Sequence, residues 1–259
     1  MSKVSVLILR TAGTNCDMET AYGFEKAGAA PEFLHANRVF GDPSHLDRFQ
    51  IMAIPGGFTY GDDIASGKVL ANELRYKLRD AVQQFVDDGK LIIGICNGFQ
   101  VLVKSGLLPW ENGASDATLT FNDSDKFEAR WVHLKACSGN SVFVNEGDDI
   151  YIPVAHGEGK FVTRDDDVLS RLEENGQVVF RYTDPEGNLA GYPWNPNGAV
   201  GNIAGICDPT GRILGMMPHP ERHVEPTQHP RWTRDGLKAE GDGLRIFRNA
   251  VTYAQANLA

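Results

Sequence analysis

Short apolar runs alternate with helical patterns along the first part of the chain. Four of these runs have the length and composition of buried strands, namely "VSVLIL", "PEFLHA", "QIMAI" and "LIIGI". A helix is expected from about Asp17 to Gly28, and apolar residues from Leu70 to Phe85 at helical spacing predict one long amphipathic helix that closes at Gly89. This alternation predicts an α/β fold with a doubly wound, mostly parallel sheet and crossover helices. Its ligand site should lie at the carboxyl ends of the strands.

The middle of the chain, roughly residues 107 to 200, has shorter β-rich runs separated by polar turns. These runs predict inserted antiparallel strands within a single domain of residues 1–259, and they are "ARWVHLKA", "SVFV", "YIPVA" and "QVVFRYT". Two further strands, "NIAGIC" and "RILGMM", are joined by the turn "DPTG". Apolar residues from Leu244 to Leu258 then predict a C-terminal amphipathic helix. The Pro- and charge-rich residues 224–243 before it are expected to form a flexible loop.

Composition and charge exclude several classes of function. A net charge of -9 without a cluster of Lys and Arg disfavours nucleic acid, because nonspecific affinity depends on neutralising phosphates. The N-terminal apolar run is too short for a signal peptide or a membrane span, so we expect a cytoplasmic protein that makes no membrane contact. The four cysteines are scattered and form no Cys-x-x-Cys pair, which predicts free thiols without a zinc ribbon or a disulfide framework.

One of these cysteines, Cys96, falls on the turn between a predicted strand and a predicted helix, in "GICNGFQ". Gly94 and Gly98 flank it at the spacing of a nucleophile elbow, where glycines permit a tight turn that lifts the side chain out of the sheet. The helix N-terminus would favour the thiolate, which is the form that attacks a carbonyl. The plainer alternative is a small cysteine buried in the core, because glycine is frequent in this chain.

A nucleophile needs a base, and "GMMPHPERH" offers one with its orienting partner. Pro220 favours extended backbone at His219, so His219 and Glu221 should project side by side, with the carboxylate holding the imidazole. One alternative is an ordinary ion pair on a surface turn. Another is a metal site formed by His219, Glu221 and His223, although this would leave the cysteine turn without a role.

The oxyanion of a tetrahedral intermediate needs backbone donors, and "IPGGF" places a glycine turn at the end of a neighbouring parallel strand. The N–H groups of Gly57 and Asn97 are the candidates for this oxyanion hole. A plain turn between strand and helix would explain "IPGGF" equally well by itself. The stronger argument is that three such segments converge on one edge of the sheet.

Taken together, these segments resemble the class I glutamine amidotransferases, whose glutaminase domains carry Gly-x-Cys-x-Gly-x-Gln, a Pro-Gly-Gly turn and a late His-Pro-Glu. The blocks "GTNCD", "GGFTYGDD", "AHGEGKF", "NPNGA", "NIAGICD" and "GMMPHPER" are similar to those of one family within this class, the glutaminase subunits of phosphoribosylformylglycinamidine synthase. The resemblance implies a triad of the nucleophile Cys96, the base His219 and its orienter Glu221. It also implies a pocket for L-glutamine, with the substrate-binding residues Gln100, His156 and Glu158.

The family resemblance further implies that ammonia released from glutamine goes to an ATP-dependent synthetase in purine biosynthesis. The nearest approach to a phosphate-binding loop here is "GDDIASGKV", which has five residues instead of four between Gly61 and Gly67 and has Val69 in place of a hydroxyl residue. We therefore expect no cofactor and no metal in this chain, and ATP and magnesium on the partner synthetase subunit. A small third subunit is part of the assembly in some members of the family. Two other hypotheses are a cysteine hydrolase or isomerase acting on a different carbonyl and a non-catalytic binding subunit.

Overall fold

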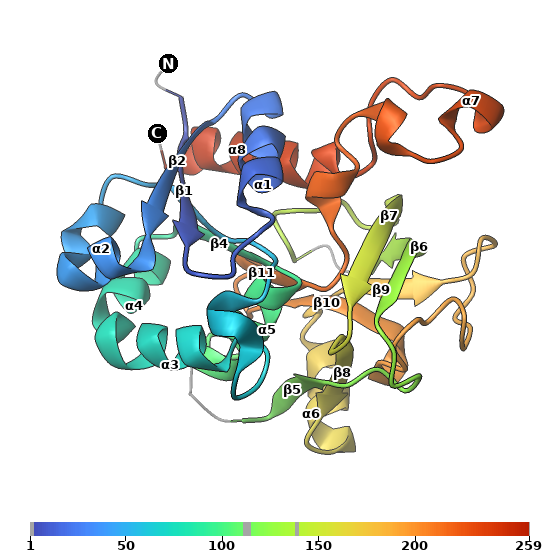
Figure 1. Cartoon of the computed structure of the whole chain (residues 1–259), viewed down its shortest axis with the longest axis horizontal. Helices are drawn as coiled ribbons and strands as arrows, with labels where there is room; N and C mark the ends of the chain where they lie inside the picture. Colours follow the sequence, from blue (N-terminus) through green and yellow to red (C-terminus); the bar gives the residue numbers. More distant parts are fainter. Residues whose placement is uncertain (1–2, 111–114, 138–139, 259) are drawn as a thin grey trace.

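A nine-stranded sheet runs through the computed structural model, which describes residues 3–110, 115–137 and 140–258 (Figure 1). The strand order is β2-β1-β3-β4-β11-β10-β9-β6-β7. The first five strands pair in parallel, and they are β2 (Ala30–His35), β1 (Ser5–Arg10), β3 (Ile51–Ile54), β4 (Leu91–Ile95) and β11 (Ile213–Met216). The predicted doubly wound, mostly parallel α/β sheet is confirmed.

Helices cover both faces of the parallel half of the sheet (Figure 1). On one face, α1 (Asp17–Lys26) packs on the C-terminal helix α8 (Leu244–Asn257), where the rings of Phe24 and Phe247 meet edge to face at 4.9 Å. The other face carries α3 (Lys68–Lys77), α4 (Arg79–Asp87) and α5 (Asn97–Ser105), and α2 (Ala36–Gly41) follows β2.

The expectation of one long helix between Leu70 and Phe85 was wrong. The backbone of Leu78 leaves the helical region, with φ −124° and ψ 9°, and separates α3 from α4. Leu74, Leu78 and Val82 nevertheless all remain buried. The break redirects the chain without changing which side chains face the core, so the apolar spacing continues across it and does not reveal it.

Four antiparallel strands extend the sheet and confirm that the inserted strands are antiparallel. They are β10 (Ile203–Cys207), β9 (Val178–Thr183), β6 (Glu128–Ala136) and β7 (Asp149–His156), while β5 (Ala117–Thr120) pairs separately with β8 (Lys160–Thr163). The expected strand "SVFV" is instead a turn, in which Phe143 is buried because it packs into the core and not because it joins a sheet. A helix that the sequence analysis did not predict, α6 (Asp166–Glu174), is capped by the side chain of Asp165.

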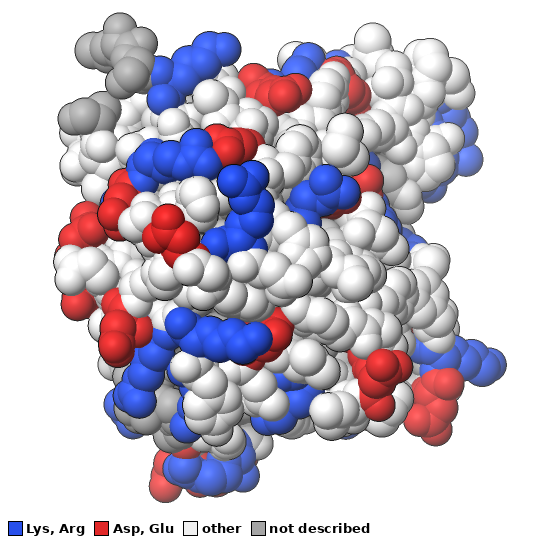
Figure 2. Space-filling model, turned by 60° about the vertical axis from the view of Figure 1, so that its left-hand side comes forward, with Lys and Arg blue, Asp and Glu red and all other residues white. Residues whose placement is uncertain are grey.

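The stretch before α8, expected to be a flexible loop, contains a short 3-10 helix (Pro226–Gln228) and α7 (Trp232–Asp235). Charged side chains of both signs are interspersed over the face drawn in Figure 2. Among the described residues, no helix has both the length and the apolar character that a bilayer crossing requires.

Candidate active site

Cys96 occupies a strained turn between β4 and α5. Its φ of 52° and ψ of −105° lie outside the regions that ordinary residues prefer, and its N–H donates to the carbonyl of Met216 at 2.7 Å. The flanking glycines allow this turn because the backbone is crowded there. A β-carbon would lie 2.6 Å from the carbonyl oxygen of Gly98 if placed at Gly94, and 1.9 Å from that of Ile54 if placed at Gly98. The geometry of the predicted elbow is therefore present.

The side chains of His219 and Glu221 point toward each other, as the extended "HPE" segment predicted. His219 Nδ1 lies 2.6 Å from Glu221 Oε1, and the carboxylate is fully buried. The backbone is fixed as well, because the N–H of His219 donates to the carbonyl of Pro153 on β7 at 2.8 Å. The pair is therefore a buried charged contact, which excludes the alternative of an exposed ion pair on a surface turn.

The charge of Glu221 controls the protonation of His219. Burial disfavours the imidazolium, but the negative charges of Glu221 and Cys96 outweigh burial and hold the pKa of His219 well above its ordinary value. With Nδ1 held by the carboxylate, Nε2 has no hydrogen-bond partner among the described residues. Nε2 is thus the nitrogen that can exchange a proton with the thiol of Cys96.

A cavity of about 260 Å³ opens onto these side chains at the carboxyl ends of the parallel strands. Of the residues singled out from the sequence, those that line it are Cys96, His219, Gly57, Gln100, His156 and Glu158. Glu221 and Asn97 are buried beside it and do not line it. The sequence prediction thus placed its candidate residues around one cavity, although their individual roles remain predictions.

The two candidate oxyanion donors follow neighbouring strands, with Gly57 on the turn after β3 and Asn97 at the start of α5 after β4. Neither the N–H of Gly57 nor that of Asn97 has an acceptor among the described residues, so both are available to a ligand. The Asn97 side chain joins the two loops, because its Oδ1 accepts from both the backbone N–H and the hydroxyl of Thr59, at 3.1 and 2.8 Å. The loop that carries Thr59 is therefore hydrogen-bonded directly to the residue after Cys96.

His156 is held on both sides by asparagine side chains. Its Nδ1 donates to Asn122 Oδ1 at 3.1 Å, and Asn197 Nδ2 approaches its Nε2 at 3.5 Å. Burial, together with the positive charge of His219, lowers the pKa of His156 to about 3, so its ring is neutral at neutral pH. This arrangement makes His156 a rigid wall of the cavity. The turn residues of "NPNGA" suggest an exposed loop, but Asn197 is fully buried beside His156.

Gln100 is similarly fixed. Its Nε2 donates to the carbonyl of Glu158 at 2.6 Å, and its Oε1 accepts from Asn97 at 2.9 Å. The amide therefore ties α5 to the segment after β7, with one N–H and one lone pair left over for a ligand.

A second thiol adjoins the histidine, on the "GTNCD" segment that follows β1 and reaches the same edge of the sheet. Cys16 lies at the start of α1 with its Sγ 4.0 Å from His219 Nδ1, and Arg222 donates to the same sulfur at 3.1 Å. Burial raises the pKa of the Cys16 thiol, which keeps it protonated at neutral pH. Cys16 lines the same cavity as Cys96, but its protonated thiol lacks the thiolate character expected of the attacking group.

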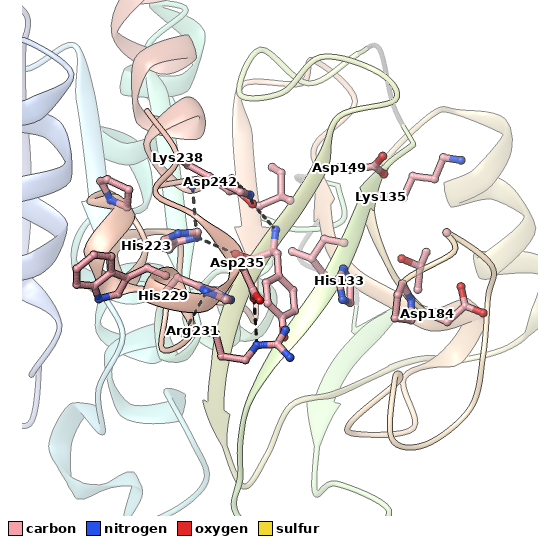
Figure 3. A pocket seen from close by; sticks show the side chains of 18 of the residues that line it. His133, Lys135, Asp149, Asp184, His223, His229, Arg231, Asp235, Lys238 and Asp242 are labelled. Carbon is pink, nitrogen blue, oxygen red and sulfur yellow. Dashed lines mark hydrogen bonds and ion pairs between the residues drawn. The ribbon is translucent and has the colours of Figure 1, made fainter. Parts of the chain in front are cut away.

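A larger cavity of about 410 Å³ lies away from the catalytic residues, between β6, β7 and residues 223–242 (Figure 3). Three imidazoles line it, those of His133, His223 and His229, and His223 Nδ1 donates to the carbonyl of Tyr151 at 2.8 Å. Because His223 belongs to this second cavity, the alternative metal set of His219, Glu221 and His223 is not assembled. No cysteine is among the residues that line this larger cavity.

One edge of the sheet therefore carries a strained cysteine between strand and helix, a buried His–Glu pair and free backbone donors. These groups define a site suited to thiol attack on a carbonyl group.

Residues 3–254 match the family described as the CobB/CobQ-like glutamine amidotransferase domain. Phosphoribosylformylglycinamidine synthase subunit PurQ of Dehalococcoides mccartyi is 52% identical, over 98% of this chain and 99% of its own. The subunit of the same name from Archaeoglobus fulgidus is 40% identical over 98% of both chains. A chain in the structure of PurLQS from Thermotoga maritima superimposes with a TM-score of 0.74 at 31% identity, over 97% of this chain and 99% of that one. The chain therefore belongs to the PurQ family of glutamine amidotransferases.

Proposed function

We propose that this chain is the glutaminase subunit of a phosphoribosylformylglycinamidine synthase. It hydrolyses L-glutamine and delivers the ammonia to a synthetase subunit that converts formylglycinamide ribonucleotide to formylglycinamidine ribonucleotide. The observation that carries the proposal is the meeting of Cys96 and the His219–Glu221 pair at one small cavity. Membership in the PurQ family supports the choice of reaction and partner.

In the proposed mechanism, the thiol proton of Cys96 passes to His219 Nε2 and Sγ attacks the side-chain carboxamide carbon of glutamine. His219 Nε2 gives a proton to the departing nitrogen, so that ammonia leaves and a glutamyl thioester remains. The same nitrogen then takes a proton from water, whose oxygen attacks the thioester and releases glutamate and the Cys96 thiol. Glu221 keeps Nδ1 protonated and stabilises the imidazolium through both steps.

The carbonyl oxygen of glutamine becomes an oxyanion in each tetrahedral intermediate. We assign its stabilisation to the N–H groups of Gly57, which lines the cavity, and of Asn97, which directly follows the nucleophile, because neither has an acceptor among the described residues. Gln100 and Glu158 are proposed to position the rest of the substrate, since both line the cavity and are joined by a hydrogen bond. His156 is proposed to shape the wall against which the substrate packs.

The synthetase subunit is proposed to bind ATP and magnesium, because the only candidate phosphate loop in this chain has the wrong spacing and no hydroxyl residue. Co-purification with the synthetase tests whether the assembly also contains a small third subunit. The proposed reaction needs no cofactor on this chain, since the thiol and the imidazole together carry out the hydrolysis.

The test is to purify the chain with its synthetase subunit and to measure product formation with glutamine or with ammonium chloride as nitrogen donor. Cys96→Ala should abolish synthesis from glutamine and leave synthesis from ammonia intact, because the acceptor chemistry lies on the other chain. Cys137→Ser, which alters an exposed thiol, is the matched control and should preserve both activities. Loss of both activities in Cys96→Ala would contradict the proposal, and so would hydrolysis of simple esters in preference to glutamine.

We further propose that the partner activates the glutaminase. The loop of residues 56–67 carries the donor Gly57 and is joined to the elbow through Thr59 and Asn97. A partner that contacts this loop would therefore align both oxyanion donors at once. Turnover of glutamine should be slow in the isolated chain and should rise when the synthetase and its substrate are added. Equal rates in the two conditions would exclude such activation.

A further inference from the structure

The reaction proposed above leaves Cys16 without a role, although its thiol adjoins the catalytic base. The Sγ of Cys16, a ring nitrogen of His219 and a carboxylate oxygen of Glu221 all lie within 4.8 Å of one another, and all three side chains are buried. Around a tetrahedral zinc ion, ligand atoms lie about 3–4 Å apart, since zinc bonds to sulfur, nitrogen and oxygen are about 2.0–2.3 Å long. Small side-chain shifts would bring these three atoms to that spacing.

A second observation points to a ligand at the same place. Glu221 Oε2 is fully buried and has no hydrogen-bond partner among the described residues, while the other carboxylate oxygen holds His219. Burying a carboxylate oxygen without a hydrogen-bond donor is unfavourable, and a bound cation or a proton would relieve that cost. Together, thiolate sulfur, imidazole nitrogen and carboxylate oxygen match the ligand preferences of zinc.

We propose that Cys16, His219 and Glu221 form an inhibitory site for zinc or a similar thiophilic divalent cation. Binding releases two protons to solvent, that of the Cys16 thiol and that on His219 Nδ1, and replaces the hydrogen bond between His219 and Glu221 by two bonds to the metal. His219 Nδ1 is then a metal ligand, so the ring can no longer act as the base for Cys96. Three protein ligands suffice for such a site, because zinc commonly keeps a fourth position for solvent or another ligand.

Arg222 is the group that opposes the cation. Its guanidinium donates to Cys16 Sγ at 3.1 Å, but it also pairs with Glu19 at 3.1 Å, which offsets its charge. Arg222 lines the cavity and its side chain is 34% exposed, so it has room to move away while the sulfur remains in place. A metal-bound thiolate can also accept the same N–H, in the way that outer hydrogen bonds support metal ligands.

The first test is inhibition by zinc, and it rests on the proposed glutaminase activity. Zinc chloride should inhibit glutamate release, and a chelator should restore it. Outer-sphere changes already weaken metal sites by about 10–100-fold, so Cys16→Ala should raise the inhibitory zinc concentration at least about tenfold, relative to its own metal-free rate. Cys137→Ser should be inhibited like the parent. Equal sensitivity of Cys16→Ala and the parent would overturn the proposal, because zinc would then act through other residues.

The second test does not depend on activity. Cadmium bound to thiolate absorbs in the ultraviolet, so titration with cadmium reports sulfur coordination directly. In a Cys137→Ser background, Cys96→Ala should keep a saturable band at one ion per chain, and Cys16→Ala should lose it. A band that disappears with Cys96 instead of Cys16 would refute the site even if glutamine hydrolysis is confirmed. Retention of the band in both variants would equally refute it.

Discussion

The substitution Gly56→Ala tests whether the close packing of Cys96 and His219 around the turn after β3 matters for the reaction. A β-carbon placed there would lie 2.9 Å from His219 Cε1, 3.1 Å from Cys16 Sγ and 3.5 Å from Cys96 Cβ. Ordinary contacts begin at about 3.4 Å, so the imidazole must move by about half an ångström. The φ of Gly56 is not in the left-handed region, so Gly56→Ala adds a steric contact without backbone strain.

The expected cost follows from this displacement. A misplacement of about 1 Å at a reacting group can cost about a hundredfold in rate, so half of it should lower kcat/KM for glutamine roughly tenfold or more, equivalent to about 1.4 kcal/mol. Overpacking should reduce the free energy of unfolding by about 1–3 kcal/mol. Glutamate release in the complex with the synthetase measures the first quantity, and urea unfolding of the isolated chain measures the second.

Gly41→Ala is the matched control, because its β-carbon would meet nothing within 4 Å and its φ is also outside the left-handed region. It should leave both kcat/KM and unfolding unchanged within error. The reasoning would be refuted if Gly56→Ala kept the parental kcat/KM, or if Gly41→Ala lost as much. Retained synthesis from ammonia would show that the Gly56→Ala effect is confined to the glutaminase.

Three further changes examine the site from other directions. The charge of Glu221 helps to hold the pKa of His219 high, so Glu221→Gln should lower that pKa and move the corresponding limb of the pH–rate profile to lower pH. The loss of kcat should be smaller than in His219→Ala. A limb that does not move would show that Glu221 does not set the pKa of His219. The pKa of His156 is about 3 in the folded chain and about 6.5 in the unfolded chain, so the stability it contributes is present above pH 6.5 and is lost as the pH falls toward 3. Urea unfolding should show up to about 2 kcal/mol of this loss at pH 5, and none of it in His156→Gln. Parallel pH dependence of the two proteins would contradict this prediction. A glutamine-mimicking electrophile should label Cys96 before Cys16 and Cys207, as measured by peptide mass spectrometry. A simple alkylating agent should also label the exposed Cys137. Labelling of Cys16 first by the glutamine mimic would overturn the assignment of the nucleophile.

The elbow could be read from the sequence because its requirement is local. Gly94 and Gly98 sit where the backbones of β4, α5 and β3 approach so closely that no side chain fits, and this need fixes glycine at a recognisable spacing. The "HPE" pair was equally readable, since extended backbone alone brings His219 and Glu221 together. Both features depend on neighbours along the chain, which a sequence displays directly.

The errors arose where burial and secondary structure separate. Phe143 is buried in a turn, so an apolar run there imitated a strand. Leu78 interrupts a helix without interrupting its apolar stripe, because the residues on both sides still face the core. In α6, only Val168 and Leu172 are buried among four carboxylates, so this short and strongly charged segment was taken for a polar turn although its pattern is amphipathic. Hydrophobic spacing reports which side chains are buried and only indirectly how the backbone reaches them.

The position of Cys16 beside His219 shows the remaining limit, since the two residues are 203 positions apart. They follow β1 and β11, which are separated in the sheet by β3 and β4. The turn after β3 closes this gap, because the carbonyl of Gly56 accepts from the N–H of Cys16 at 3.1 Å while its missing side chain leaves room for His219 and Cys96. The sequence "PGG" signals that some backbone approaches closely there, but it does not say which one. Only the folded sheet identifies Cys16 as the neighbour, and the same glycine on which the catalytic geometry depends also brings this second thiol to the base.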